Sequence, residues 1–189
     1  MRSKILPLLP VLTLVSGIIA FSVLLSNTTP EAFVEYIGIE NGYVLMFALA
    51  FFSGVSLFTG VPYVLTLITL VAGGLNPILI AFVATIGDGL GGTVAYGLGR
   101  MSGKLAERGY VRTIQEYLLS TAQKRPWLLP LAIFAYGCAA PLSNDVVTIP
   151  MGIARYPFIK TMIPLQLGTF VYNSVIAFAG LYVYTYFFG

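Results

Sequence analysis

Long apolar runs, separated by short polar segments, dominate the sequence. Three of these runs, 5–25, 78–98 and 162–188, each hold at least 21 residues. At about 1.5 Å per residue, such a run is long enough for an α-helix to cross the roughly 30 Å hydrocarbon core of a bilayer. We therefore predict three transmembrane helices. The first is predicted to be an uncleaved N-terminal anchor, because its apolar run is long and no small-x-small cleavage site follows it.

Two further apolar stretches, 43–72 and 127–154, are each interrupted near the middle by residues that break helices. The first contains the segment FTGVP, which ends at Pro62, and the second contains the segment PLSND, which begins at Pro141. Each stretch is too long for one span and too short for two spans with a loop between them. We expect each to form a re-entrant hairpin of two short helices, broken at Pro62 and at Pro141.

The composition agrees with a protein that lies in a bilayer. Of the 189 residues, 58% are hydrophobic and 9% are charged, whereas a soluble domain is about one quarter charged. This excludes an ordinary water-facing domain and leaves no room for a separate catalytic or nucleic-acid-binding module. The chain has one cysteine, Cys138, and no histidine, so it lacks the commonest general base and metal ligand. We predict no enzymatic activity, no metal, no cofactor and no nucleic-acid partner.

The charged residues predict the orientation of the chain, because basic residues in short loops stay on the cytoplasmic side. The ten basic residues lie before position 5, between 100 and 125, and between 155 and 160. The segment 26–41 holds three glutamates and no basic residue. This distribution predicts a multi-pass protein of the cell (plasma or inner) membrane, with a cytoplasmic N terminus and an external C terminus.

Two polar segments are predicted to form amphipathic helices at the membrane surfaces. Thr28 and Glu31 fit a capping box and Pro30 fits a first helical turn, which predicts a short external helix. Between 100 and 112, basic residues recur at every fourth position. This spacing predicts a cationic helix on the cytoplasmic lipid surface, with a dedicated phosphate site as the alternative.

Each predicted hairpin precedes a predicted span, and the topology gives these two units opposite orientations. The sequence therefore predicts an all-α integral membrane protein, built as an inverted repeat of re-entrant helical hairpin plus transmembrane helix, with an extra N-terminal transmembrane helix. The alternative is a structural membrane protein with kinked but ordinary spans. A shift of 79 positions aligns Pro62 with Pro141, Thr69 with Thr148, Gly73 with Gly152 and Gly89 with Gly168. The predicted units are 1–41 (anchor and external helix), 42–99 (first repeat), 100–125 (basic helix) and 126–189 (second repeat).

Two carboxylates fall where hydrocarbon is expected. Asp88 lies near the centre of the second predicted span, and Asp145 lies at the predicted tip of the second hairpin. A charged side chain at such a depth costs at least about 2.5 to 3.5 kcal/mol on insertion scales, and it normally faces a cavity or a partner. The alternative is a protonated carboxyl group bonded to backbone that the break leaves free. The predicted polar chamber around Asp145 also contains Ser143, Asn144, Thr66, Thr69 and Thr148, and Arg100 and Arg155 are predicted headgroup contacts on the cytoplasmic side.

The glycine-rich span that ends in Tyr96, Gly99 and Arg100 resembles the DedA or VTT-domain (SNARE-associated Golgi protein) membrane family. The PLSND hairpin with the later Arg155-Tyr-Pro sequence is similar to that family's second re-entrant loop. The resemblance covers about 51–173 and implies two opposed re-entrant hairpins, transport or scrambling of polyprenyl-phosphate or phospholipid, and proton coupling in some members.

The sequence departs from the family's pattern at four positions. No acidic residue follows Pro62, and Cys138 and Asn144 stand where hairpin arginines are expected. Asp88 stands one helical turn before the usual acidic position, which is Gly92 here. The resemblance is therefore to a divergent member that lacks the usual hairpin arginines.

These patterns together predict a transporter or scramblase that moves a lipid between leaflets through a polar site at the hairpin tips. Membrane lipids and a lipid substrate are the predicted partners, and homo-oligomerisation is left open. A permease for small solutes or ions and a non-transporting membrane assembly factor remain the alternatives.

Overall fold

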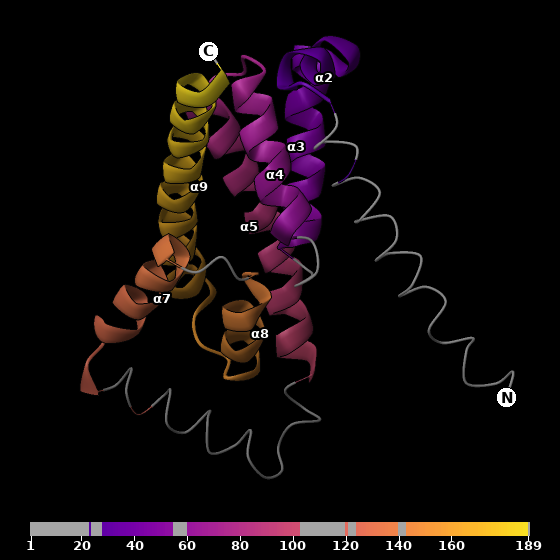
Figure 1. Ribbon diagram of the computed structural model, residues 1–189. Helices are drawn as coiled ribbons and strands as arrows, with labels where there is room; N and C mark the ends of the chain where they lie inside the picture. Colours follow the sequence, from indigo (N-terminus) through magenta and orange to yellow (C-terminus); the bar gives the residue numbers. More distant parts are fainter. Residues whose placement is uncertain are drawn as a thin grey trace, which may run out of the picture.

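The computed structural model describes residues 23, 28–54, 60–102, 120, 124–139 and 143–188. The predicted N-terminal anchor and most of the predicted basic helix lie outside the described residues. All the elements found in the described part are helices (Figure 1). They are α2 (Pro30–Ile37), α3 (Ile39–Ser53), α4 (Gly60–Ala72), α5 (Pro77–Ser102), α7 (Leu128–Ala139), α8 (Asp145–Ile153) and α9 (Phe158–Phe188).

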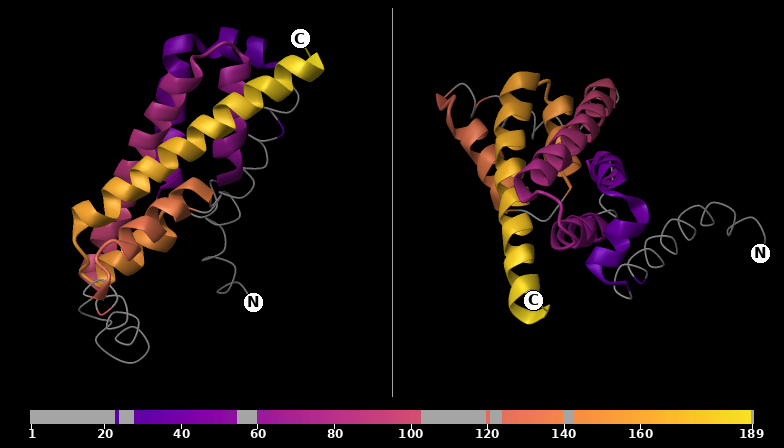
Figure 2. Two further views of the ribbon diagram at one scale, coloured as in Figure 1. Left: turned by 90° about the vertical axis from the view of Figure 1, so that its left-hand side faces the viewer. Right: turned by 90° about the horizontal axis from the view of Figure 1, so that it is seen from above.

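Two helices, α5 and α9, are long and apolar enough to cross a membrane. They contain 26 and 31 residues, or about 39 and 46 Å at 1.5 Å per residue. They run in opposite directions, and Figure 2 shows that α9 crosses α5 at an angle. The predicted spans 78–98 and 162–188 are therefore confirmed as helices. A third crossing would be possible if α2 and α3, which meet at a bend of 98°, formed one span.

Four shorter helices pack against this long pair. The helices α3 and α4 lie beside the half of α5 that is nearer Pro77, and α8 lies beside the other half (Figure 1). The first helix of each short pair packs on the long helix that follows it, so α3 contacts α5 and α7 contacts α9. The second helix packs on the other long helix, so α4 contacts α9 and α8 contacts α5. The two long helices are thereby joined through both short pairs.

Glycines allow the close helix contacts. A Cβ atom on Gly91 would lie 2.2 Å from the Phe51 carbonyl oxygen and 2.9 Å from Gly54 Cα. A Cβ atom on Gly168 would lie 2.4 Å from the Phe134 carbonyl oxygen and 2.9 Å from Gly137 Cα. Since packing in lipid depends on small residues that let helix backbones approach, these contacts explain why glycine stands at the crossings of α3 with α5 and of α7 with α9.

In the first apolar stretch the structure places Pro62 inside a helix, and residues 55–59, which include the start of the predicted breaker segment, lie outside the described residues. The helix α3 ends at Ser53 and α4 begins at Gly60, so Pro62 lies in the first turn of α4 and is not the break. A proline is tolerated there because the first amide groups of a helix have no partner within the helix. In the second stretch α7 ends at Ala139 and α8 begins at Asp145. The predicted break at Pro141 lies outside the described residues.

The short helix predicted around Glu31 forms and begins at Pro30 as predicted, but with a different cap. Thr29, not Thr28, is the N-cap, and its side chain accepts a hydrogen bond from the Ala32 amide at 3.4 Å. Pro30 then occupies the first helical position, which places the cap at the residue before it. The Tyr184 hydroxyl donates to the Glu31 carboxylate at 2.8 Å, so α2 is connected to the last turns of α9.

Candidate functional site

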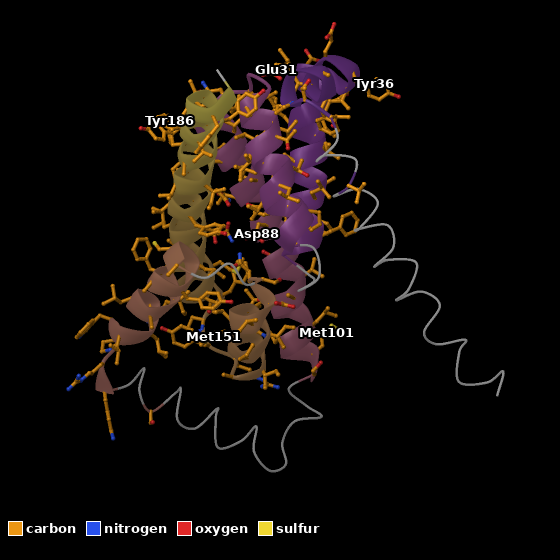
Figure 3. The ribbon with its side chains drawn as sticks, in the orientation of Figure 1. Glu31, Tyr36, Asp88, Met101, Met151 and Tyr186 are labelled. Carbon is orange, nitrogen blue, oxygen red and sulfur yellow. The ribbon has the colours of Figure 1, made fainter. Side chains whose placement is uncertain are left out.

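Asp88 lies in the middle of α5. It is 11 residues from Pro77 and 14 from Ser102, or about 16 and 21 Å along the helix. Figure 3 shows Asp88 between the end of the molecule that carries Glu31 and the end that carries Met101. Its side chain is 6% exposed. A carboxyl group at this depth in a spanning helix needs a polar partner or a cavity.

The partner of Asp88 comes from the start of α8. The Asn144 side-chain amide donates to Asp88 Oδ2, and Asn144 is itself buried. The two helices approach closely at Gly152 of α8, where a Cβ atom would lie 2.2 Å from the Tyr96 carbonyl oxygen of α5, and they stay in ordinary contact at Gly92. A Cβ atom on Gly92 would lie 3.4 Å from Thr148 Cγ2 and 3.8 Å from Asn144 Cβ. The structure therefore brings three predicted site residues, Asp88, Asn144 and Thr148, to one place.

The ends of the two broken stretches meet beside Asp88. The buried Ser143 hydroxyl, just before α8, donates to the Ser53 carbonyl oxygen at the end of α3 at 2.6 Å. The Tyr136 hydroxyl of α7 donates to the Ser143 carbonyl oxygen at 3.1 Å. The end of α3 also lies against the backbone of α5, since a Cβ atom on Gly54, the residue after α3, would be 2.4 Å from the Asp88 carbonyl oxygen. Backbone and side-chain contacts thus join α3, α5, α7 and α8 at the level of Asp88, and we call this region the polar layer.

Two predicted site residues in the polar layer have buried atoms that lack a partner. Asp145 Oδ1 and Thr148 Oγ1 have no hydrogen bond within the described part of the chain. A buried polar atom left unpaired costs about 1 to 3 kcal/mol, and such atoms call for an explanation such as a bound water, ion or ligand. Together with Asp88, these atoms give the polar layer unused capacity to accept hydrogen bonds.

Other predicted site residues have different roles. The Thr66 hydroxyl donates to the Pro62 carbonyl oxygen at 2.7 Å, and the Thr69 hydroxyl donates to the Leu65 carbonyl oxygen at 2.8 Å. Both hydroxyl protons therefore bond to the backbone of α4 itself. Arg100 and Arg155 are exposed, and Arg100 is 12 residues beyond Asp88, or about 18 Å along α5. Neither arginine contributes to the polar layer.

A second buried polar cluster was not predicted. The Tyr63 hydroxyl of α4 donates to Asn173 Oδ1 of α9 at 2.5 Å, and the Asn173 side-chain amide donates to Thr85 Oγ1 of α5 at 3.1 Å. Asn173 is fully buried. The sequence did contain a signal, because Asn173 and Gln166 are amides within the apolar run 162–188, but the prediction named uncharged polar residues only in the two broken stretches and none in the long spans. The cluster joins α4, α5 and α9 one turn of α5 away from Asp88.

Fold and site together define, within the described residues, an all-helical membrane protein with two or three helices able to cross a membrane and a buried polar layer beside the first long helix, α5. The described residues contain no group of three or more Cys, Asp or Glu side chains that could hold a metal ion. Comparisons with protein-family models, curated proteins and solved structures find no match for the chain.

Proposed function

We propose that the protein is a transporter or scramblase of the cell membrane that moves a lipid between leaflets, with the polar layer as part of its mechanism. The observation that carries this proposal is the position of Asp88, which is buried at the centre of a helix able to span the bilayer and lies where two broken helical stretches meet. Intramembrane carboxylates are rare and mark substrate, ion or proton pathways. The unpaired atoms of Asp145 and Thr148 supply acceptors in the same layer.

The packing supports an inverted repeat as the basis of this function. In each half, the first short helix packs on its own long helix and the second packs on the long helix of the other half. The glycine pairs at α3–α5 and α7–α9 have the same contacts. Gly54 and Gly137 are 83 positions apart, whereas Gly91 and Gly168 are 77 apart. The structurally equivalent glycines are therefore separated by different numbers of residues in the sequence, and no single shift aligns the two halves. The shift of 79 aligns Gly168 with Gly89, whereas the contacts make Gly168 equivalent to Gly91. Inverted repeats with broken helices at the midplane are typical of secondary transporters.

The charges favour a lipid whose polar group is uncharged or zwitterionic. The polar layer contains carboxylates and amides, and all five basic side chains in the described residues are exposed. A lipid-linked phosphate would need a buried cation, which Arg100 and Arg155 do not supply from the surface. We therefore place phospholipids with zwitterionic headgroups ahead of polyprenyl-phosphate.

The proposal can be tested with the purified full-length protein in liposomes that contain fluorescent phosphatidylcholine. Reduction of the outer-leaflet dye by dithionite reports exchange between leaflets. We expect the wild type to accelerate exchange and the variants Asp88→Asn and Asp145→Asn to lose most of the gain. The first variant retains an oxygen that can accept from Asn144, so its fold should persist. Glu35→Gln, the same change at an exposed carboxylate, is the matched control and should behave as the wild type.

Several outcomes would overturn the proposal. If the wild type does not accelerate exchange, the protein is not a scramblase or passive lipid transporter under these conditions, and an imposed proton gradient would be the remaining test of driven transport. Equal rates for the wild type and both carboxylate variants would remove the polar layer from the mechanism. Flux of small solutes or ions without lipid exchange would identify a permease instead, and the absence of every flux would favour an assembly factor.

A further inference from the structure

A groove runs along the outside of the molecule between α5 and α9. Its volume is about 610 Å³, within the range of about 300 to 1,000 Å³ that small-molecule sites occupy. Its walls are apolar and include Phe82 and Leu90 on α5 and Leu167 on α9, each about half exposed. The rings of Phe82 and Phe170 meet edge to face at 6.4 Å across one end. In a bilayer this groove is open to lipid from the side.

The groove lies at the centre of the spanning region. On α5 it extends from Phe82 to Thr93, a distance of about 16 Å, or about half of the 30 Å hydrocarbon thickness. Its middle is Gly89, which follows Asp88 directly. The groove thus crosses the depth at which a lipid headgroup is farthest from water during exchange between leaflets.

One amide side chain at the middle of the groove has no partner. Both polar atoms of Gln166, Oε1 and Nε2, are buried and lack a hydrogen bond within the described part of the chain. The amide lies against Gly89, because a Cβ atom there would be 2.8 Å from Gln166 Cδ. An amide both donates and accepts, so it can be satisfied by a group that does the same. A hydroxyl group is such a partner, whereas an ester oxygen could only accept.

The remaining lining residues narrow the chemistry of the occupant. The other polar side chains that line the groove are the hydroxyl-bearing Thr85 and Thr93, and none of the lining residues is charged. Without a counter-charge, a charged headgroup would have a large desolvation cost at this depth. An uncharged polar headgroup has a smaller cost, and Gln166 would lower it further. The exposed Thr93 hydroxyl donates to the Gly89 carbonyl oxygen at 2.8 Å, so towards a headgroup it could serve only as an acceptor.

We propose that the groove between α5 and α9 carries the headgroup of an uncharged, hydroxyl-bearing lipid across the bilayer centre, with Gln166 as its hydrogen-bonding partner. The acyl chains would remain in the bilayer beside the groove. This inference rests on the proposed lipid exchange and adds the substrate class and the route. It uses a different surface from the polar layer, because Asp88 bonds to Asn144 at the start of α8 whereas Gln166 is one of the residues that line the groove.

The test uses liposomes that contain the full-length protein and one of three lipids with the same fluorescent acyl chain. These are glucosylceramide, phosphatidylcholine and phosphatidylglycerol, which have uncharged, zwitterionic and anionic headgroups. We expect the wild type to accelerate the exchange of glucosylceramide between leaflets more than that of the other two lipids. Gln166→Leu should slow glucosylceramide exchange about tenfold, as expected for the loss of one or two hydrogen bonds. Val175→Leu, on an exposed face of α9 outside the groove, is the matched control and should keep the wild-type rate.

A second variant covers the case in which Gln166→Leu does not fold. Leu90→Trp adds bulk to an exposed wall of the groove, so it should slow glucosylceramide exchange without requiring a change in the core. Preference for phosphatidylcholine or phosphatidylglycerol, or equal rates for Gln166→Leu, Leu90→Trp and the control, would overturn the inference and leave the proposed lipid exchange standing. The failure of the wild type to move any lipid, both without and with an imposed proton gradient, would overturn both.

The groove could instead bind a second copy of the chain, and this outcome has its own measurement. Thr93→Cys, in a chain whose only native cysteine has been replaced by alanine, places one thiol at the groove. Efficient formation of disulfide-linked dimers in the membrane would identify the groove as a protein interface and overturn the inference. A thiol that stays monomeric and reacts with lipid-soluble maleimide supports an open groove.

Discussion

The contact of α3 with α5 provides a direct test of the packing. A Cβ atom at Gly91 would lie 2.2 Å from the Phe51 carbonyl oxygen, whereas ordinary contacts lie at 3.4 to 4 Å. Gly91→Ala therefore requires the two helices to separate by about 1 Å, and overpacking of this kind costs about 1 to 3 kcal/mol. Alanine regains up to about 1 kcal/mol of helix propensity. We expect a net loss of about 2 kcal/mol, because the obstructing atom belongs to a backbone that cannot rotate away.

Gly97 offers a matched control on the same helix. A Cβ atom there would meet nothing within 4 Å, so Gly97→Ala should leave stability unchanged or raise it by up to about 1 kcal/mol. For a chain of this size, 1 kcal/mol moves the melting temperature by about 2 to 4 °C. Thermal unfolding in detergent, followed by circular dichroism, should place Gly91→Ala about 4 to 8 °C below the wild type. Equal melting temperatures for the two variants would refute the close approach of α3 to α5.

Three further predictions test separate parts of the structure. Tyr63→Phe removes a buried bond to Asn173 and should cost about 1 to 3 kcal/mol, because an acceptor stays buried without a partner; chemical unfolding in detergent measures this loss, and a variant within 0.3 kcal/mol of the wild type would contradict it. Ser143→Ala should cost about 1 kcal/mol and make the segment before α8 more sensitive to protease, and unchanged cleavage would count against the contact. In a cysteine-free background, Glu35→Cys should react with impermeant maleimide from outside the cell and Arg125→Cys only after lysis, and the reverse pattern would invert the proposed topology.

The length of an apolar run was enough to predict the long helices. The run 78–98 became a helix from Pro77 to Ser102, because a bilayer-length apolar segment has to satisfy its backbone hydrogen bonds internally. The division of 43–72 and of the second stretch into short helices of 9 to 15 residues was also predictable from breakers and length. Helix boundaries were less accurate, since a proline is compatible both with a break and with the first turn after one, as Pro62 illustrates.

The sequence predicted the site through its buried carboxylates, and it did not predict which uncharged side chains contact them. Asp88 was identified because a carboxylate in hydrocarbon has a large cost. Asn144 was predicted as part of a chamber around Asp145, and its bond to Asp88 was not predicted. The contacts of Thr66 and Thr69 with their own helix could not be foreseen, because a threonine in a helix can bond either to the preceding turn or to a distant group. Which of these occurs depends on how α4 is rotated against its neighbours, and the sequence periodicity of an apolar helix does not fix that rotation.

The two uncharged amides of α9 show why hydrogen-bonding capacity is as informative as charge in a membrane helix. Asn173 and Gln166 are two turns apart in the same apolar run. Asn173 accepts from Tyr63 and donates to Thr85, so packing alone accounts for it. Gln166 has neither bond and lies on a groove open to lipid. In hydrocarbon an amide without a partner retains its full desolvation cost, so a chain selected only for stability would have no reason to keep one there. The difference in pairing therefore assigns a structural role to Asn173 and favours a ligand for Gln166.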